Sequence, residues 1–173
     1  MKSALIIILV AALGGVAYAI QQRVTRQARE RLLAELATLP PVTLDFTTPE
    51  GAILCLEDAY RKHDIEAAVA CRDFATEARL WLQQRPFYSS DLLAEMLSEM
   101  TKTMEWSYRE SMATHWPIDW ERAQSYFSKR EPYAEGVVVV CEVTRGPDGS
   151  LLRQRLLVTE TPTGWRVVTH LPK

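Results

Sequence analysis

The stretch DAYRKHDIEAAVACRDF, residues 58–74, decides the fold of this chain. Ala59 and Tyr60 end one apolar helical face, and Asp64 stands where its carboxylate can accept hydrogen bonds from the free N–H groups of a second helix. Glu66 would lie in the first turn of that helix, where negative charge favours the helix dipole. The spacing therefore predicts two helices that meet at Asp64. The stretch also gathers three aspartates, a histidine, a tyrosine and a cysteine, so an active site is the alternative.

Three further helix signals surround this joint. Thr48-Pro49-Glu50 predicts the start of the first helix, because threonine can cap it and proline suits the first helical position. Residues 75–84 are predicted to form a third helix, and Ser89-Ser90-Asp91 to begin a fourth and longer one. The apolar stripe of the fourth helix consists of Leu92, Leu93, Met96, Leu97, Met100 and Met104. At this spacing the stripe is expected to pack in the core, and an adaptable binding groove is the alternative.

After residue 117 the hydrophobic period changes from helical to strand-like. Four segments rich in valine, leucine and aromatic residues are predicted as strands: 124–129, 133–144, 151–159 and 165–171. Turn sequences at residues 146–149 and 161–164 separate the last three. Helices followed by an antiparallel meander predict an α+β domain over residues 42–173, with the helices packed on one sheet face.

The N-terminus has the composition of a membrane segment. An uncharged apolar run covers residues 4–20, so residues 1–20 are predicted to be a membrane anchor or a signal peptide. Small residues around Tyr18 favour cleavage after Ala19, whereas the four arginines that follow closely favour a retained single-pass anchor. Residues 21–41 are predicted to be a helical stalk that ends at Pro40-Pro41.

Composition excludes several classes of function. A net charge of −2 and the lack of a basic stripe give no reason to expect nucleic-acid binding. The three cysteines, Cys55, Cys71 and Cys141, have no metal-ligand spacing, so neither a metal site nor a cofactor is predicted. They are expected to be small buried residues, with a bond between Cys55 and Cys71 as the alternative.

The element order resembles the nuclear transport factor two-like superfamily. The resemblance rests on Ala59-Tyr60, then Asp64-Ile65-Glu66-Ala67-Ala68, then Asp73-Phe74, and it covers about residues 46–171. It implies a curved antiparallel sheet that forms a cone-shaped pocket with the helices, and pairing of two copies through their sheets. The sequences of residues 48–54 and 57–60 are also similar to those of bacterial immunity proteins of this fold. That similarity implies a toxin as the protein partner and a bacterial inner-membrane location, with the periplasm as the alternative after cleavage.

An enzymatic role is the less favoured interpretation. Asp64 has a capping role at the joint, whereas Asp73 and Glu57 have none that the sequence shows. The resemblance implies Asp73 as a general base in the cone, with Tyr60 or His170 as hydrogen-bond donor. Among the predicted strands, only His170 and Glu142 offer acid–base groups. The chain is therefore expected to be non-enzymatic, and a small-molecule pocket that uses Asp73 is the alternative.

Recognition of a protein is the favoured expectation. The residues predicted to bind the partner are three tryptophans and three glutamates: Trp106, Trp116, Trp120, Glu95, Glu99 and Glu105. Tryptophan is common at interface centres, although packing against the sheet would also explain these three. The acidic face of the long helix would attract a basic toxin, or would simply be solvated. An envelope assembly scaffold is a further alternative.

Overall fold

The computed structural model describes residues 2–84, 90–116 and 123–171, without the side chains of residues 2–17, 90 and 91. The chain divides into two units, Met1–Pro40 and Pro41–Lys173. The first unit contains one helix, α1 (Lys2–Leu36). No helix among the residues described with side chains is long and apolar enough to cross a membrane. The predicted membrane segment, residues 4–20, falls mostly outside those residues.

The second unit begins with three short helices whose starts are capped by side chains. They are α2 (Pro49–Arg61), α3 (Ile65–Ala70) and α4 (Phe74–Gln83). Thr48 accepts a hydrogen bond from the N–H of Gly51, and Asp64 accepts one from Ala67, so both predicted caps are confirmed. Between α2 and α3, His63 adopts a positive φ of 52° that lets the chain reverse within three residues.

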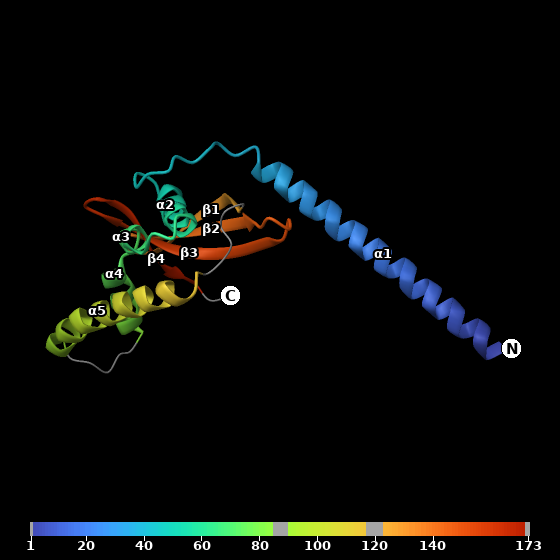
Figure 1. Ribbon diagram of the computed structural model, residues 1–173, viewed down its shortest axis with the longest axis horizontal. Coiled ribbons are helices and arrows are strands. Elements are labelled where there is room, and N and C mark those ends of the chain that lie inside the picture. The colour runs from blue at the N-terminus through green and yellow to red at the C-terminus, as the bar shows by residue number, and fades with distance from the viewer. Residues whose placement is uncertain (1, 85–89, 117–122, 172–173) are drawn as a thin grey trace. The chain divides into compact units, whose positions relative to one another are not determined.

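The long fourth helix of this unit is α5 (Ser90–Thr114). It packs against α4, and α4 in turn contacts the last strand of the sheet (Figure 1). The predicted apolar stripe of α5 faces α4 but is only half-buried, and Leu92 is exposed. The stripe thus packs at the edge of the core over most of α5, because two helices side by side cover only part of each other. Near the end of α5, Met112 is buried in the main core.

Four antiparallel strands follow in the order of the chain. They are β1 (Gln124–Ala134), β2 (Val137–Arg145), β3 (Leu151–Thr161) and β4 (Gly164–His170), and they lie side by side as a meander. The prediction of an α+β domain with an antiparallel sheet is confirmed. The sequence pattern predicts two separate strands, 124–129 and 133–144, with a break at residues 130–132. That break is wrong, because β1 continues through Pro132, which is tolerated beside a bulge on this edge strand. The turn instead falls at Gly136, whose φ is +69°.

The two faces of the sheet bury different apolar clusters. Val140, Leu156, Val158 and Val167 face the helices and pack with Ile53 and other residues of α2. On the opposite face, Val137, Val139, Leu157 and Val168 form a second cluster, against which Leu80 of α4 packs. A bulge between Leu157 and Val158 shifts the register of β4. Because of this shift, Val167 and His170 both pair with β3 residues whose side chains lie on the helix-facing side of the sheet.

The free edge of β4 is paired with the joint between α3 and α4. The N–H of Val167 donates to the carbonyl of Cys71 at 2.9 Å, and the N–H of Asp73 donates to the carbonyl of Val167 at 2.9 Å. Arg72 therefore forms a parallel bridge with Val167. This pairing satisfies backbone groups that an edge strand would otherwise expose, and it fixes the helices on the sheet.

A second attachment joins the segment before α2 to the start of β4. The N–H of Trp165 donates to the carbonyl of Phe46 at 2.8 Å, and the Arg166 guanidinium lies 4.0 Å from the centre of the Phe46 ring. Gly164 has a φ of +106°, and an added Cβ would lie 2.5 Å from the Phe46 carbonyl oxygen. Both its backbone conformation and this close contact require glycine.

We expect Gly164→Ala to lower the free energy of unfolding by about 3 kcal/mol, because backbone strain and overpacking add. Gly136→Ala is the matched control, since its φ is also positive but nothing lies within 4 Å of an added Cβ. The control should lose only about 1–2 kcal/mol. Urea titration in mild detergent measures both values. Equal losses would show that the segment around Phe46 does not pack closely on Gly164.

Candidate functional site

A cavity of about 220 Å³ opens between α2, α5 and the helix-facing side of the sheet. Its walls are mainly apolar, and its polar groups come from α2, α5, β2, β3, β4 and the joint between α3 and α4. The lining residues are Ile53, Leu56, Glu57, Tyr60, Arg72, Tyr108, Met112, Glu142, Gln154, Leu156 and His170. An apolar cavity with a few converging polar groups is the usual form of a small-molecule site.

Two buried glutamates lie at one end of the cavity. Glu57 of α2 and Glu142 of β2 are 2% and 1% exposed, and they are bridged by the hydroxyl of Ser125 from β1. The Ser125 Oγ lies 2.5 Å from Oε1 of Glu57 and 2.7 Å from Oε1 of Glu142. Carboxyl groups are rarely so fully buried unless partners satisfy them, so this pair is the main chemical feature of the site.

The two carboxyl groups have different surroundings. Glu142 accepts further hydrogen bonds from Thr144 Oγ1 and Gln154 Nε2, each at 2.7 Å. Glu57 accepts one from Arg61 at 3.0 Å. Burial raises the pKa of Glu57 from 4.5 to about 9, assisted by the nearby Glu142, and Arg61 and Ser125 only partly oppose this. Glu57 is therefore the member of the pair that holds a proton at neutral pH.

Two tyrosines and an arginine form another wall of the cavity. The hydroxyls of Tyr60 and Tyr108 are 2.9 Å apart and join α2 to α5. Burial raises the pKa of both phenols, so both stay protonated at neutral pH. The Arg72 guanidinium lies 4.7 Å from the centre of the Tyr108 ring, and its Nη2 donates to Glu77 at 2.7 Å and to the Val168 carbonyl at 2.5 Å. Its charge is thus compensated by Glu77 outside the cavity.

His170 stands at the exposed rim of the cavity. Loss of hydration at the cavity wall lowers its pKa, and the positive charge of Arg72 lowers it further. Because its ordinary pKa is already near 6.5, the imidazole is neutral at pH 7. The rim therefore contributes a neutral polar group.

The structure separates the three residues named for an enzymatic site. Tyr60 and His170 both line the cavity, but Asp73 is not among its lining residues. The Asp73 carboxylate caps α4 by accepting a hydrogen bond from the N–H of Thr76 at 3.0 Å. Asp73 thus has the structural role that the sequence did not reveal, and α4 begins one residue earlier than expected. The cavity uses Glu57 and Glu142 as its acids.

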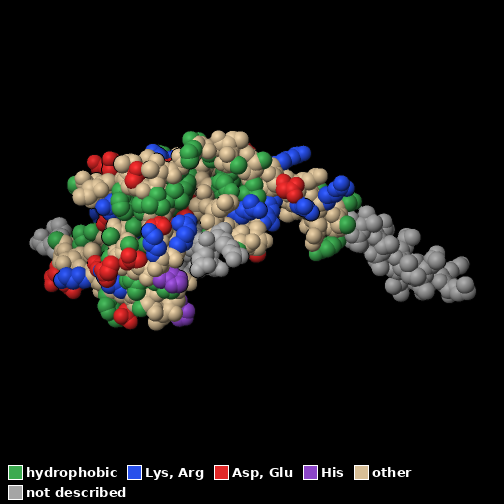
Figure 2. All heavy atoms as spheres, turned by 45° about the horizontal axis from the view of Figure 1, so that its top comes forward, with side chains coloured by type: hydrophobic (Ala, Val, Ile, Leu, Met, Phe, Trp, Pro, Cys, Tyr) green, Lys and Arg blue, Asp and Glu red, His purple; other side chains and the backbone are tan. Residues whose placement is uncertain are grey.

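The residues predicted to bind a protein partner lie in different settings. Trp106 on α5 is 64% exposed, whereas Trp116 is half-buried, stacked on His63 with ring centres 4.8 Å apart. Trp120 lies outside the described residues. Glu95 and Glu99 are exposed, and Glu105 pairs with Arg109 at 2.9 Å. On the face drawn in Figure 2, basic and acidic side chains are interspersed over the folded unit.

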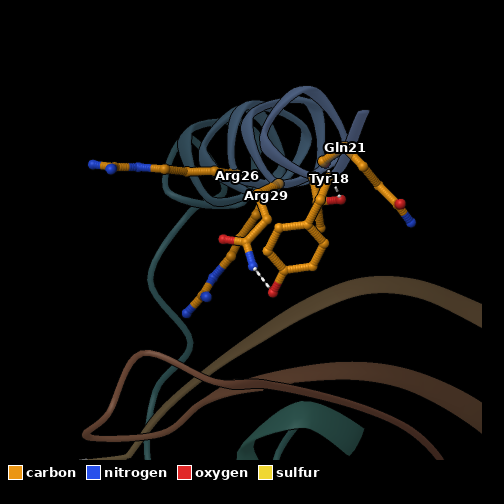
Figure 3. Close-up of a pocket in the computed structure, with 6 residues that line it drawn as sticks. Tyr18, Gln21, Arg26 and Arg29 are labelled. Carbon is orange, nitrogen blue, oxygen red and sulfur yellow. Dashed lines mark hydrogen bonds between the residues drawn. The ribbon is translucent and has the colours of Figure 1, made fainter. Parts of the chain in front are cut away.

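Two other concave regions are weaker candidates. One, of about 500 Å³, is lined only by residues of α1, and its walls therefore come from a single helix. There the Gln22 amide donates to the Tyr18 hydroxyl at 2.6 Å, and Tyr18 and Arg29 project from the same side of α1 (Figure 3). The other is an open groove of about 420 Å³ on α4, α5 and β4, and it shares Arg72 and Tyr108 with the cavity. Neither contains a buried pair of acids.

Cysteines and metal-ligand groups add no further site. Cys55, Cys71 and Cys141 are free thiols, and burial raises the pKa of Cys71 to about 12, which makes this thiol unreactive. Among the side chains that the structure describes, no three histidine, cysteine or acidic groups are placed to hold a metal ion.

Comparisons of the chain with known protein families, with curated proteins and with solved structures found no match.

Sequence reasoning found part of this site. It singled out Glu57 as an acid with no role at the joint, and Glu142 as an acid on a strand. It did not find Ser125, Gln154 or Arg72, whose roles depend on register and helix placement. The alternation along β2 could have shown that Glu142 shares a face with the buried Val140.

We expect the free energy of unfolding to fall as the pH rises from about 5 to about 9. In this window the folded state keeps the proton on Glu57, whereas the unfolded state has already released it. The slope would reach at most about 1.4 kcal/mol per pH unit. Urea titrations across this range measure it. In Glu57→Gln, which cannot ionise, this contribution should disappear, and in the control Glu110→Gln it should remain. An unchanged slope in Glu57→Gln would contradict the assignment.

Proposed function

We propose that the Pro41–Lys173 unit binds a small organic molecule in the cavity between α2, α5 and the sheet. The observation that supports this most is the buried pair Glu57 and Glu142 at the end of a mainly apolar cavity. If stability alone mattered, apolar side chains could fill this space. Two buried acids are a costlier choice, because their carboxyl groups lose hydration when they are buried. A retained acid pair beside open space is the pattern of a binding site.

The size of the cavity limits the ligand. Its volume of about 220 Å³ is below the range of roughly 300–1,000 Å³ for pockets that hold drug-sized molecules. A water-sized group takes ~30 Å³ in a liquid, so about seven such groups fill the cavity. Bonded atoms lie closer together than separate water molecules, so we propose a ligand of about ten non-hydrogen atoms at most, with an apolar body and one polar end.

The proposed role is binding without catalysis. Each oxygen of both glutamates already has a hydrogen-bond partner among its neighbours, and this fixes the two groups in place. The three residues considered for an enzymatic site do not meet, since Asp73 is used as a helix cap. Fixed polar groups of this kind orient a ligand and set its specificity.

For the fold we propose membership of the nuclear transport factor two-like superfamily. The capped joint at Asp64, the meander with two bulged strand pairs and the cavity against α2 all support this assignment. Pairing of two copies through their sheets and a role as an envelope scaffold stay predictions. So do the membrane anchor at residues 4–20, the bacterial inner-membrane location and the periplasmic alternative after cleavage following Ala19.

A second candidate function is recognition of a protein, such as the toxin neutralised by an immunity protein. It is favoured by the large apolar side chains exposed on the α4–α5 pair, which are Trp81, Leu92 and Trp106 at 38%, 43% and 64%. Exposed tryptophans beside an acidic helix face are typical of an interface with a basic protein. This function uses a different surface from the cavity, so each can be tested alone.

We expect Met112→Trp to abolish ligand binding, because the larger ring fills the cavity from α5. Met104→Trp is the matched control on the same helix, since Met104 lines the open groove instead. The measurement is the shift in melting temperature of the full-length chain with a panel of nine- or ten-atom aromatic alcohols, acids and amines. Circular dichroism shows whether each variant is folded. A panel that shifts neither the wild type nor the control would disprove the proposed pocket.

For the second candidate, we expect Glu95→Lys with Glu99→Lys to weaken binding of a basic toxin at least tenfold, mainly through slower association. The control places the same changes at two exposed glutamates away from α5, Glu135 in the turn between β1 and β2 and Glu160 on β3. Co-expression with a toxin encoded beside this chain, followed by growth measurement, reads out neutralisation. If the α5 variant protected the cells fully, the acidic face of α5 would not be the toxin-binding surface.

A further inference from the structure

The bridge between the two buried acids requires one extra proton. A serine hydroxyl has a single hydrogen, so Ser125 can donate to only one of Glu57 and Glu142. It nevertheless lies within 2.7 Å of an oxygen of each. The other carboxyl must therefore carry a proton and donate it to the serine oxygen, since an ionised carboxylate in its place would face a lone pair of that oxygen.

Hydrogen-bond counting assigns that proton to Glu57. Glu142 receives hydrogen bonds from Thr144 and Gln154, and with Ser125 three of its roughly four acceptor positions are filled. Glu57 receives one from Arg61 in addition to its contact with Ser125. The pair thus holds one negative charge and one proton at the end of the cavity. Loss of the proton would open new acceptor positions on Glu57.

We infer that the ligand of this cavity is a small organic cation, a primary ammonium on an apolar body, which replaces the proton of Glu57. This inference rests on the proposed function. On binding, the ammonium donates hydrogen bonds to Glu57 and to the last position of Glu142, and the Glu57 proton leaves to solvent. No covalent bond forms or breaks, and the charge of the site is unchanged, because one cation enters and one proton departs.

The other charged and titratable groups around the cavity are compatible with a cation. Arg72 is held by Glu77 and the Val168 carbonyl, and Arg61 is held by Glu57. Tyr60, Tyr108 and His170 are neutral at pH 7. The apolar walls of Ile53, Leu56, Met112 and Leu156 would contact the body of the ligand. An anion at the same place would face two acids, which would exclude it.

The experiment is calorimetric titration of the full-length chain in lipid nanodiscs with three probes of nearly equal size. They are 2-phenylethylamine, 2-phenylethanol and phenylacetate. At pH 7 we expect the amine to bind at least tenfold more tightly than the alcohol, and phenylacetate not to bind. Titrations in buffers of different ionisation enthalpy should show close to one proton released for each amine bound. Binding of the amine should strengthen as the pH rises from 6 to 8.

Glu57→Gln separates a charge effect from a packing effect. Its amide resembles the protonated acid in shape but cannot ionise, so this variant should lose the preference for the amine over 2-phenylethanol. It should bind the amine at least tenfold more weakly and release no proton. Glu110→Gln, an exposed glutamate of α5, should behave as the wild type.

Different outcomes disprove different claims. Equal affinity for amine and alcohol, or amine binding without proton release in the wild type, would overturn the assignment of a cation and leave the pocket itself intact. No binding of any probe would overturn the pocket as well. The proton count in the wild type requires no variant, so the inference is decided even if Glu57→Gln fails to fold.

Discussion

The structure of the folded unit depends on the pairing between the α3–α4 joint and the edge of β4. Two backbone hydrogen bonds at Val167 hold Cys71 and Asp73 against the strand. Because Arg72 lies between them, its guanidinium is directed to the Val168 carbonyl and Glu77, beside the Tyr108 ring. One short contact thus protects the sheet edge, orients α4 and sets one wall of the cavity.

The cavity results from a conflict between apolar packing and buried polar groups. On the helix-facing side of the sheet, Val140, Leu156 and Val158 pack with α2. Further along the same two strands this face carries Glu142 and Gln154, and with Ser125 of β1 these side chains need one another as hydrogen-bond partners. A buried network is stable only when every member is satisfied, so it fixes the shape of that end of the cavity.

The long helix α5 has two environments along its length. Its last turns bring Tyr108 and Met112 to the cavity, where Tyr108 contacts Tyr60. Its earlier turns pack against α4 and leave Trp106 and Leu92 exposed. A ligand site and an interaction surface can therefore lie on the same helix without sharing residues. This arrangement is why both candidate functions are consistent with one fold.

The sequence alone determined the class of fold and the helix starts, because caps such as Thr48 and Asp64 act over three or four residues. It also singled out Glu57 and Glu142 as unexplained acids. It could not show that Asp73 is a cap or that Gly136 makes the first hairpin turn, since local signals there competed with others nearby. Only the tertiary structure joined Glu57 to Glu142 through Ser125. In the chain, Ser125 is 68 positions from Glu57 and 17 positions from Glu142. Such a contact depends on strand register and helix docking, which are decided by packing over the whole sheet.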